Sequence, residues 1–324
     1  MKRIAVVALV ALLILGLAPP GDLVAQQRRL VTIASGWVVG VYYPLAGAMS
    51  RIAYSAKDLN IRATVESSGA SVANAQLIGA GDADFALLQN DIAYYAYNGT
   101  TLPAFTGKAV KSMGGVFTIY PELVHIVAAH ASGVKSVRDL RGKRVVLGPQ
   151  GSGTEQNALQ VLEAYGLKES DLAKAERIDA AAAADQIKDG RVDAAFFTTG
   201  LGSAVIIDTF ISGKAVLLRV DGAAGEALRK AYPFYTMEKV PAHTYKGQEQ
   251  DVVTPAVMAM MVARSELPED LVYNFTKAIF DNLKQFHAAH AAAKNLTLQT
   301  ALNGMPIPLH PGAARFFKEK GVSK

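Results

Sequence analysis

Residues 78–91 read IGAGDADFALLQND, and residues 187–200 read IKDGRVDAAFFTTG. Aligned with Gly81 on Gly190, both stretches run from a helical segment through a glycine and an aspartate to a short apolar run with a polar end. A glycine commonly ends a helix, and a short apolar run is typical of a buried parallel strand. The repeat therefore predicts two similar α/β lobes, with coincidence between two ordinary αβ units as the alternative.

Strand-like and helical patterns alternate on both sides of this repeat. The expected strands are Leu30–Ala34, Ile61–Glu66, Asp84–Leu88, Leu123–Ala129, Arg144–Leu147, Asp193–Phe197 and Val257–Ala263. The expected helices are Pro44–Tyr54, Ser71–Ala80, Thr154–Tyr165, Ala182–Lys188 and Glu269–Ala292. Such alternation favours an α/β fold with largely parallel sheets.

The second lobe is predicted to be inserted in the first. We expect residues 26–122 and 255–324 to form lobe 1 and residues 123–254 to form lobe 2, so that two sheets with flanking helices are joined by two crossing strands. Two lobes joined in this way can close on a ligand about a hinge.

The first 25 residues have the layout of a secretory signal peptide. Lys2 and Arg3 precede the apolar run Ile4–Leu17, and Ala25 is a candidate for the last residue before cleavage. The apolar run is short for a spanning helix, and an uncleaved membrane anchor is the alternative. With no cysteine in 324 residues, the chain has neither disulfides nor a lipoprotein anchor site, and we expect a soluble periplasmic protein.

Composition narrows the possible partners. Hydrophobic residues make up 51% of the chain, which excludes a disordered protein. The net charge is a mild +5, and basic residues are scattered without aromatic interleaving, so nucleic-acid binding has little support.

The sharpest candidate site is the loop GPQGSGT, residues 148–154. Its glycines allow backbone N–H groups to converge, and Ser152, Gly153 and Thr154 lie where a helix is expected to begin, a place that favours anions. No lysine follows the last glycine, so the loop is not a nucleotide P-loop. An ordinary glycine-containing loop capped by Thr154 is the alternative.

A similar arrangement of polar residues occurs in lobe 1, at Ser67–Asn74. Ser68, Ser71 and Asn74 could serve a carboxylate or an amine at a strand end, or Ser68 and Ser71 could simply cap a helix. Gln89 and the pair Thr198–Thr199 are the polar strand ends of the repeat, where ligands collect in open α/β sheets. Asp91 is expected to cap the next helix.

Catalytic and metal sites have weak support. His287 and His290 are spaced to share a helix face, but no glutamate accompanies them, so we expect no metal site. There is no G-x-S-x-G elbow and no cysteine nucleophile. We expect neither a cofactor nor an enzymatic activity.

The chain resembles the TAXI solute-binding receptors of TRAP transporters. The resemblance covers essentially the whole mature chain and rests on the order of several stretches: GVYYPLAGAMS, SSGASVANAQLIGAGDADFALLQND, YPELVHIVA, LRGKRVVLGPQGSGT, DGRVDAAFFTTG and PIPLHPGAARFFKE. It implies a periplasmic-binding-protein fold that closes on a small organic anion, of the glutamate or 2-oxoglutarate kind, and delivers it to an ion-driven TRAP permease.

The resemblance also implies a ligand site. Carried over by position, the site comprises Gly36, Trp37, Gly40, Tyr42, Tyr43, Ser68, Ser71, Asn74, Gln89, Ser152, Gly153, Thr154, Thr198 and Thr199. The family usually has small residues where Trp37 stands. Trp37 either fills the cleft and shortens the ligand, or lies on the rim against the loop or the permease.

Three other functions compete with a TRAP receptor. A receptor of an ABC importer can have the same fold, a sensor subunit would bind ligand without transport, and a periplasmic hydrolase or transferase would need Ser152 or His125 for turnover.

Overall fold

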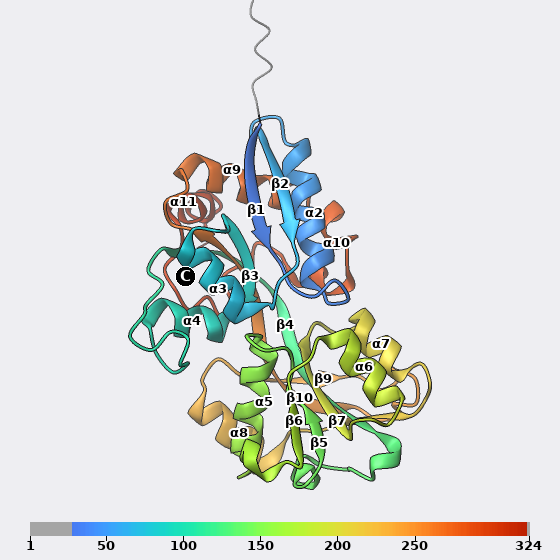
Figure 1. Cartoon of the computed structure of the whole chain (residues 1–324). Coiled ribbons are helices and arrows are strands. Elements are labelled where there is room, and N and C mark those ends of the chain that lie inside the picture. Colours follow the sequence, from blue (N-terminus) through green and yellow to red (C-terminus); the bar gives the residue numbers. More distant parts are fainter. Residues whose placement is uncertain (1–27, 323–324) are drawn as a thin grey trace, which may run out of the picture.

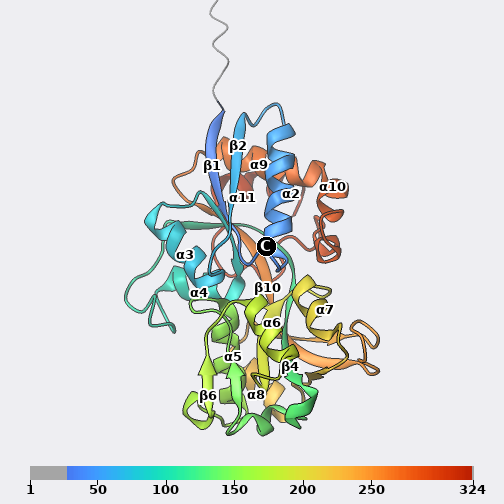
Figure 2. The same cartoon turned by 45° about the vertical axis from the view of Figure 1, so that its right-hand side comes forward.

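The structure is a computed structural model that describes residues 28–322. The predicted signal peptide, residues 1–25, lies outside the described residues. Figure 1 and Figure 2 show two lobes, one above the other, with two long strands running between them. Within residues 28–322, no helix combines the length and the apolar character needed to cross a membrane.

The lobes have the same kinds of element. The upper lobe in Figure 1 contains strands β1 (Arg29–Ala34), β2 (Ile61–Glu66) and β3 (Phe85–Gln89) and helices α2 (Tyr42–Ser55), α3 (Ser71–Ala80), α4 (Asn90–Asn98), α9 (Glu269–Asp281), α10 (Leu283–His287) and α11 (Pro311–Glu319). The lower lobe contains β5 (Arg144–Val146), β6 (Lys174–Glu176), β7 (Ala194–Thr199), β8 (Ala215–Leu218), β9 (Thr236–Val240), α5 (Gly153–Ala164), α6 (Ala180–Lys188), α7 (Ala204–Phe210) and α8 (Gly222–Ala231). Short 3₁₀ turns occur at His130–Ser132, Val137–Leu140, Glu169–Asp171 and Ala291–Asn295.

Two long strands connect the lobes, and they make the two predicted sheets continuous. These strands, β4 (Met113–Ala129) and β10 (Val252–Arg264), pair antiparallel from one lobe into the other. The strand order is β2-β1-β3-β10-β4-β7-β5-β6, with β8 also paired to β4 and β9 to β10. Among the strands of residues 28–322, β1 pairs parallel with β2 and with β3, and β5 pairs parallel with β6 and with β7. The other strand pairs are antiparallel. The sheet is therefore mixed, and the expectation of largely parallel sheets holds only in the outer part of each lobe.

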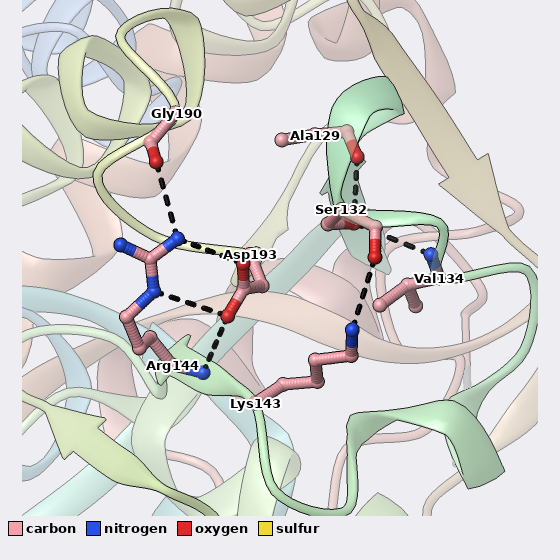
Figure 3. Close-up of polar contacts among 7 residues, drawn as sticks. All are labelled: Ala129, Ser132, Val134, Lys143, Arg144, Gly190 and Asp193. Carbon is pink, nitrogen blue, oxygen red and sulfur yellow. Dashed lines mark hydrogen bonds and ion pairs between the residues drawn. The ribbon is translucent and has the colours of Figure 1, made fainter.

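The repeated aspartates perform the same task in both lobes. Asp84 Oδ2 accepts a hydrogen bond from Thr32 N of β1 (3.0 Å), and Asp193 Oδ2 accepts one from Arg144 N of β5 (2.8 Å). Each aspartate also pairs with an arginine, Arg264 at 2.9 Å in the first case and Arg144 at 2.8 Å in the second. Figure 3 shows the second arrangement, in which Arg144 also donates to the Gly190 carbonyl. The repeat in the sequence is thus a structural repeat.

The hydrophobic cores of the two lobes are separate. Two clusters of buried residues draw on β4 up to Tyr120 and on β10 from Ala259 onward, and two others draw on β4 from Leu123 and on β10 up to Val257. On β4 this separation agrees with the proposed lobe boundary after residue 122, whereas on β10 it lies between Val257 and Ala259, a few residues after the proposed boundary at 254.

The expected helix Glu269–Ala292 is interrupted. Helix α9 ends at Asp281, α10 covers Leu283–His287, and a 3₁₀ turn follows at Ala291–Asn295. Asn282 leaves the helical conformation (φ −121°), and its side-chain Nδ2 donates to the Ala278 carbonyl (2.8 Å). An asparagine side chain that hydrogen-bonds to the backbone competes with helix continuation, which explains the break.

Candidate functional site

A cavity, partly open to solvent, lies where the two lobes meet. Its internal volume is about 20 Å³, which is room for about one water molecule, so a larger ligand requires the walls to move apart. Its lining comes from both lobes and from the crossing strand β4: Gly36, Trp37, Gly40, Val41, Tyr42, Ala70, Ser71, Gln89, Glu122, Gly153, Thr154, Thr198 and Thr199.

The loop after β1 brings Trp37 into this cavity. Gly40 N donates to the Trp37 carbonyl (3.0 Å), which closes a tight turn, and a β-carbon at Gly40 would lie 3.3 Å from that carbonyl oxygen. Trp37 lines the cavity and, with Val39, packs against a core cluster of lobe 2. Trp37 therefore contributes to the cavity wall and to the contact between lobes in this closed arrangement.

The start of helix α3 forms the second wall. Ser71 Oγ accepts a hydrogen bond from Gln89 N (3.1 Å), which ties this helix to the end of β3. Ala70, just before the helix, has a φ of +71°, a conformation that is strained for a residue with a β-carbon. The strained residue lies on the cavity wall.

Ser68 and Asn74 stabilise the same corner from behind. Asn74 Nδ2 donates to the carbonyls of Ser35 and Leu87, both at 2.6 Å, and Asn74 Oδ1 accepts from Ser68 Oγ at 2.6 Å. Neither residue lines the cavity, so their polar atoms serve to hold the ends of β1 and β3 together.

The start of helix α5 forms the third wall, from lobe 2. Ser152 caps the helix, accepting from Glu155 N (3.1 Å) and donating to the Pro149 carbonyl (2.6 Å). Thr154 Oγ1 accepts from Thr198 N (3.0 Å), which ties α5 to the end of β7. The alternative interpretation of GPQGSGT named Thr154 as the cap; the structure gives the capping role to Ser152, because Thr154 Oγ1 is bonded to Thr198 N, while Gly153 and Thr154 line the cavity.

Gln89 reaches from lobe 1 to lobe 2 across the cavity. A β-carbon at position 153 would lie 1.9 Å from Gln89 Oε1, so a side chain there would displace the end of Gln89 from this position. Three cavity residues have a buried polar atom without a hydrogen-bond partner among the described residues: Trp37 Nε1, Gln89 Oε1 and Thr198 Oγ1. Unpaired buried polar atoms are costly and rare, and a bound ligand would pair them.

Glu122 is the one ionisable side chain among the cavity residues that sequence analysis missed. It lies on β4, is 3% exposed, and accepts hydrogen bonds from the hydroxyls of Tyr42 (2.5 Å) and Tyr120 (3.4 Å). Burial raises the pKa of its carboxyl to about 8, against the lowering effect of the Tyr42 hydroxyl. A single acid inside the apolar run YPELVHIVA was the available signal, because glutamate is rarely buried without a partner.

The same burial affects Tyr42. Burial and the neighbouring Glu122 carboxyl raise the pKa of the Tyr42 hydroxyl well above its usual value. The hydroxyl therefore remains protonated and acts as a donor to Glu122.

A second set of contacts joins the lobes outside the cavity. Asp91, at the start of α4, caps the backbone of Ile92 (2.8 Å), and its other oxygen accepts from Asn157 Nδ2 of α5 (3.2 Å). Phe234 of lobe 2 packs on Tyr94 and Tyr95 of lobe 1, with ring centroids 5.0 and 5.8 Å apart. Asp91 is 1% exposed, and burial raises the pKa of its carboxyl to about 7.

The structure brings most of the predicted site residues together. Those that line the cavity are Gly36, Trp37, Gly40, Tyr42, Ser71, Gln89, Gly153, Thr154, Thr198 and Thr199. Tyr43, Ser68, Asn74 and Ser152 do not line it, and Val41, Ala70 and Glu122 line it without having been predicted.

The histidines considered in the sequence have structural contacts. His125 is buried in lobe 2 with Nδ1 3.0 Å from the Leu123 carbonyl and Nε2 2.9 Å from the Tyr245 hydroxyl, and burial lowers its pKa to about 4. His287 contacts the Leu296 carbonyl (2.9 Å), and His290 accepts from Ala292 N (3.1 Å). In residues 28–322, no group of three or more potential metal-ligating side chains comes together.

Solved structures with TM-scores above 0.5 share the fold at low sequence identity. A structure from Bordetella bronchiseptica RB50 is 15% identical, with 88% of this chain and 84% of that chain covered and a TM-score of 0.55. PhnD1 from Prochlorococcus marinus MIT 9301, solved with methylphosphonate, is 12% identical, with 82% and 89% covered and a TM-score of 0.54. The alkanesulfonate-binding protein SsuA from Xanthomonas axonopodis pv. citri, bound to MOPS, is 15% identical, with 90% and 84% covered and a TM-score of 0.47.

The sequence itself matches one family over nearly the whole described region. The match is to the NMT1-like family and extends from residue 33 to residue 321. The matched range includes both lobes and every residue of the cavity. The chain therefore belongs to the NMT1-like family.

Proposed function

We propose that this protein is an extracytoplasmic solute receptor, which binds a small organic anion of the carboxylate or amino-acid kind between its lobes and delivers it to a membrane importer. The observation that carries the proposal is the cavity itself. Residues of both lobes line it, and three of these residues have a buried polar atom without a hydrogen-bond partner among the described residues.

Three helices begin at the cavity, and their N-termini favour an acidic group on the ligand. Helices α2, α3 and α5 begin at Tyr42, Ser71 and Gly153, and all three residues line the cavity. Helix N-termini carry unpaired N–H groups and partial positive charge, which stabilise an anion without a basic side chain.

Two contacts support binding over catalysis. The Ser152 hydroxyl is engaged as a helix cap, and both ring nitrogens of His125 are paired inside lobe 2. Neither side chain lines the cavity, so neither is placed to act on a ligand there.

The importer has two candidate classes. The resemblance to TAXI receptors favours an ion-driven TRAP permease, whereas the NMT1-like match together with the fold shared with PhnD1, solved with methylphosphonate, supports an ABC importer better. A neighbouring gene for an ATPase, as opposed to a large ion-coupled permease, separates the two. Either partner places the receptor in the periplasm, as the signal peptide expected at residues 1–25 also does.

The test is a thermal-unfolding screen of the chain from Gln26 onward against small mono- and dicarboxylates, amino acids and apolar organic acids. A ligand at 100 times its Kd should stabilise the folded protein by about 2.7 kcal/mol. A shift with glutamate or 2-oxoglutarate would show that the cavity accepts a five-carbon acid beside Trp37. A shift only with smaller acids would show that Trp37 shortens the ligand.

A matched variant, Thr198→Val, tests the location of the ligand. Thr198 Oγ1 has no partner among the described residues, so its removal should leave the unliganded midpoint nearly unchanged. If the hydroxyl binds the ligand, the ligand-induced shift should shrink. If no acid raises the midpoint of the wild-type protein, the receptor proposal is wrong.

A further inference from the structure

Glu122 gives the cavity an unusual charge arrangement. Of the residues that line the cavity, all within the described part of the chain, it is the only one with a carboxylate, ammonium, guanidinium or imidazole group. The Tyr42 and Tyr120 hydroxyls donate to its two oxygens. Two tyrosine donors can hold the carboxyl in place, but they carry no positive charge to balance it when it is ionised.

A ligand with only an acid group leaves this carboxyl unbalanced. Such a ligand would lie against the N-termini of α2, α3 and α5, and Glu122 would then have to stay protonated beside it, since two like charges in a buried site repel strongly. A protonated amino group on the ligand removes the conflict, because an ammonium supplies both a positive charge and three N–H donors.

A second cavity atom also calls for a donor. Gln89 Oε1 is a buried acceptor without a partner, and it reaches into the space between the lobes until it touches Gly153. Trp37 Nε1, in contrast, is a buried donor without a partner. Two residues that line the cavity thus have an acceptor and a donor without a partner among the described residues, which matches a ligand that carries both an ammonium and an acid group.

On the basis of the proposed function, we propose that Glu122 selects ligands with a protonated amino group, so that the solute is a small zwitterion. The ammonium faces Glu122, and the acid group faces the helix N-termini. Glu122 is then the residue that distinguishes an amino acid from the oxo acid or hydroxy acid of the same size.

This assignment predicts the sign of a pH effect on binding. The titratable groups around Glu122 are Tyr42 on α2, Tyr120 on β4 and, as a more distant negative charge, Asp91 on α4. Burial raises the pKa of Glu122 to about 8 and that of Asp91 to about 7. Binding of an ammonium to ionised Glu122 releases the proton that the empty site holds, so affinity should increase as pH rises towards 8.

The experiment compares pairs of ligands that differ in the amino group: L-glutamate with 2-oxoglutarate, L-leucine with 4-methyl-2-oxopentanoate, and glycine with glycolate. Calorimetric titrations between pH 6.0 and 8.0, in buffers of different ionisation enthalpy, measure affinity and proton release together. In the wild-type protein we expect one of the amino acids to bind better than its partner, with a gain approaching tenfold per pH unit and with proton release.

Two variants locate the effect. Glu122→Gln keeps the shape but not the charge, and it should weaken amino-acid binding by about 30-fold or more and abolish the pH dependence that belongs to Glu122. Asp91→Asn removes the other carboxyl with a raised pKa. Removing its charge lowers the pKa of Glu122, so this variant should move the pH dependence to lower pH and leave the preference for the amino acid.

The possible results are distinguishable. If oxo or hydroxy acids bind as well as their amino partners and Glu122→Gln has no effect on the ratio, the zwitterion proposal is overturned while the receptor proposal stands. If affinity falls as pH rises and binding takes up a proton, Glu122 stays neutral beside an anion, and the zwitterion proposal is again overturned. If none of the compounds binds, the receptor proposal fails, and this inference fails with it.

Discussion

At the scale of single residues, Gly153 decides whether the Gln89 side chain can extend between the lobes. Gly153→Ala should weaken ligand binding by about tenfold or more, because the new methyl group displaces the end of the Gln89 side chain from the cavity. Folding stability should change by less than about 1 kcal/mol, since Gly153 opens helix α5 and alanine is a better helix former. Urea unfolding and ligand titration measure the two effects separately.

Gly47→Ala is the matched control for this substitution. Gly47 lies inside helix α2, and a β-carbon there would approach only the end of the Arg51 side chain, at 3.4 Å. This variant should bind as the wild-type protein does. Equal affinities of Gly153→Ala and Gly47→Ala would contradict the closed geometry described here.

Glu122 should make folding stability depend on pH. Its carboxyl has a pKa of about 8 in the folded protein, above the ordinary value of 4.5, so the folded state binds more protons than the unfolded state between these pH values. Stability is therefore lost as pH rises from about 4.5 to 8, by at most about 1.4 kcal/mol per pH unit relative to Glu122→Gln. The buried His125 has an opposite effect below about pH 6.5, but it is present in both proteins and cancels in the difference.

Urea unfolding of the wild-type protein and of Glu122→Gln at pH 5.0, 6.5 and 8.0 checks this expectation. The difference in unfolding free energy between the two proteins should move in favour of the variant as pH rises. A difference that stays constant over this range would mean that Glu122 is not held in its neutral form by burial.

At the scale of the elements, the two repeated aspartates each fix the start of a strand. Replacing Asp84 or Asp193 with alanine should cost about 1–3 kcal/mol, because a strand amide and an arginine each lose their acceptor. Asp189→Ala removes a more exposed ion pair, with Arg191, and should change stability by less than about 0.5 kcal/mol. Chemical denaturation of the three variants measures the contrast, and equal effects of all three would argue against a structural role for the repeat.

The elements also show where sequence reasoning succeeds. The helices after β1, β2 and β5 and the buried strands β3 and β7 lie within a few residues of the predicted ranges, because local periodicity and glycine positions determine them. The break after Asp281 was not predicted, since the periodicity of the apolar residues does not show that the Asn282 side chain hydrogen-bonds to the Ala278 carbonyl.

At the scale of the whole molecule, contacts outside the cavity should control ligand affinity through closure. Phe234→Ala removes the packing of lobe 2 on Tyr94 and Tyr95, so the closed arrangement should become less populated. Since apparent affinity falls with the population of the competent state, Kd should rise several-fold although no cavity residue has changed.

X-ray scattering with and without ligand, together with titration, tests this expectation. Phe234→Ala should have a larger radius of gyration than the wild-type protein without ligand, and saturating ligand should reduce the difference. Ile211→Ala, at an exposed apolar side chain of lobe 2, serves as the control and should change neither measurement. Unchanged affinity in Phe234→Ala would show that these aromatic contacts do not contribute to closure.

The sequence by itself determined the α/β character, the repeat of two lobes, and ten of the residues that line the cavity. The α/β character, the repeat and the polar residues at strand ends and helix starts depend on local signals, such as the glycine that ends a helix and the polar residues that end a buried strand. Gly36, Trp37, Gly40 and Tyr42 came instead from the resemblance to TAXI receptors. Residues with identical local signals could not be separated in this way. Ser71 and Ser152 both stand at helix starts, yet Ser71 lines the cavity and Ser152 does not.

Only the tertiary structure decided the rest. The long antiparallel pairing of β4 with β10 joins the two sheets into one, and it carries Glu122 into a cavity whose other walls are tens of residues away in the chain. Three features of the cavity arise from residues that the fold brings together from distant parts of the chain. They are the raised pKa of Glu122, the close approach of Gln89 to Gly153 and the position of Trp37 against lobe 2. The charge and shape of the cavity are properties of non-local contacts, so no local pattern in the sequence could have specified them.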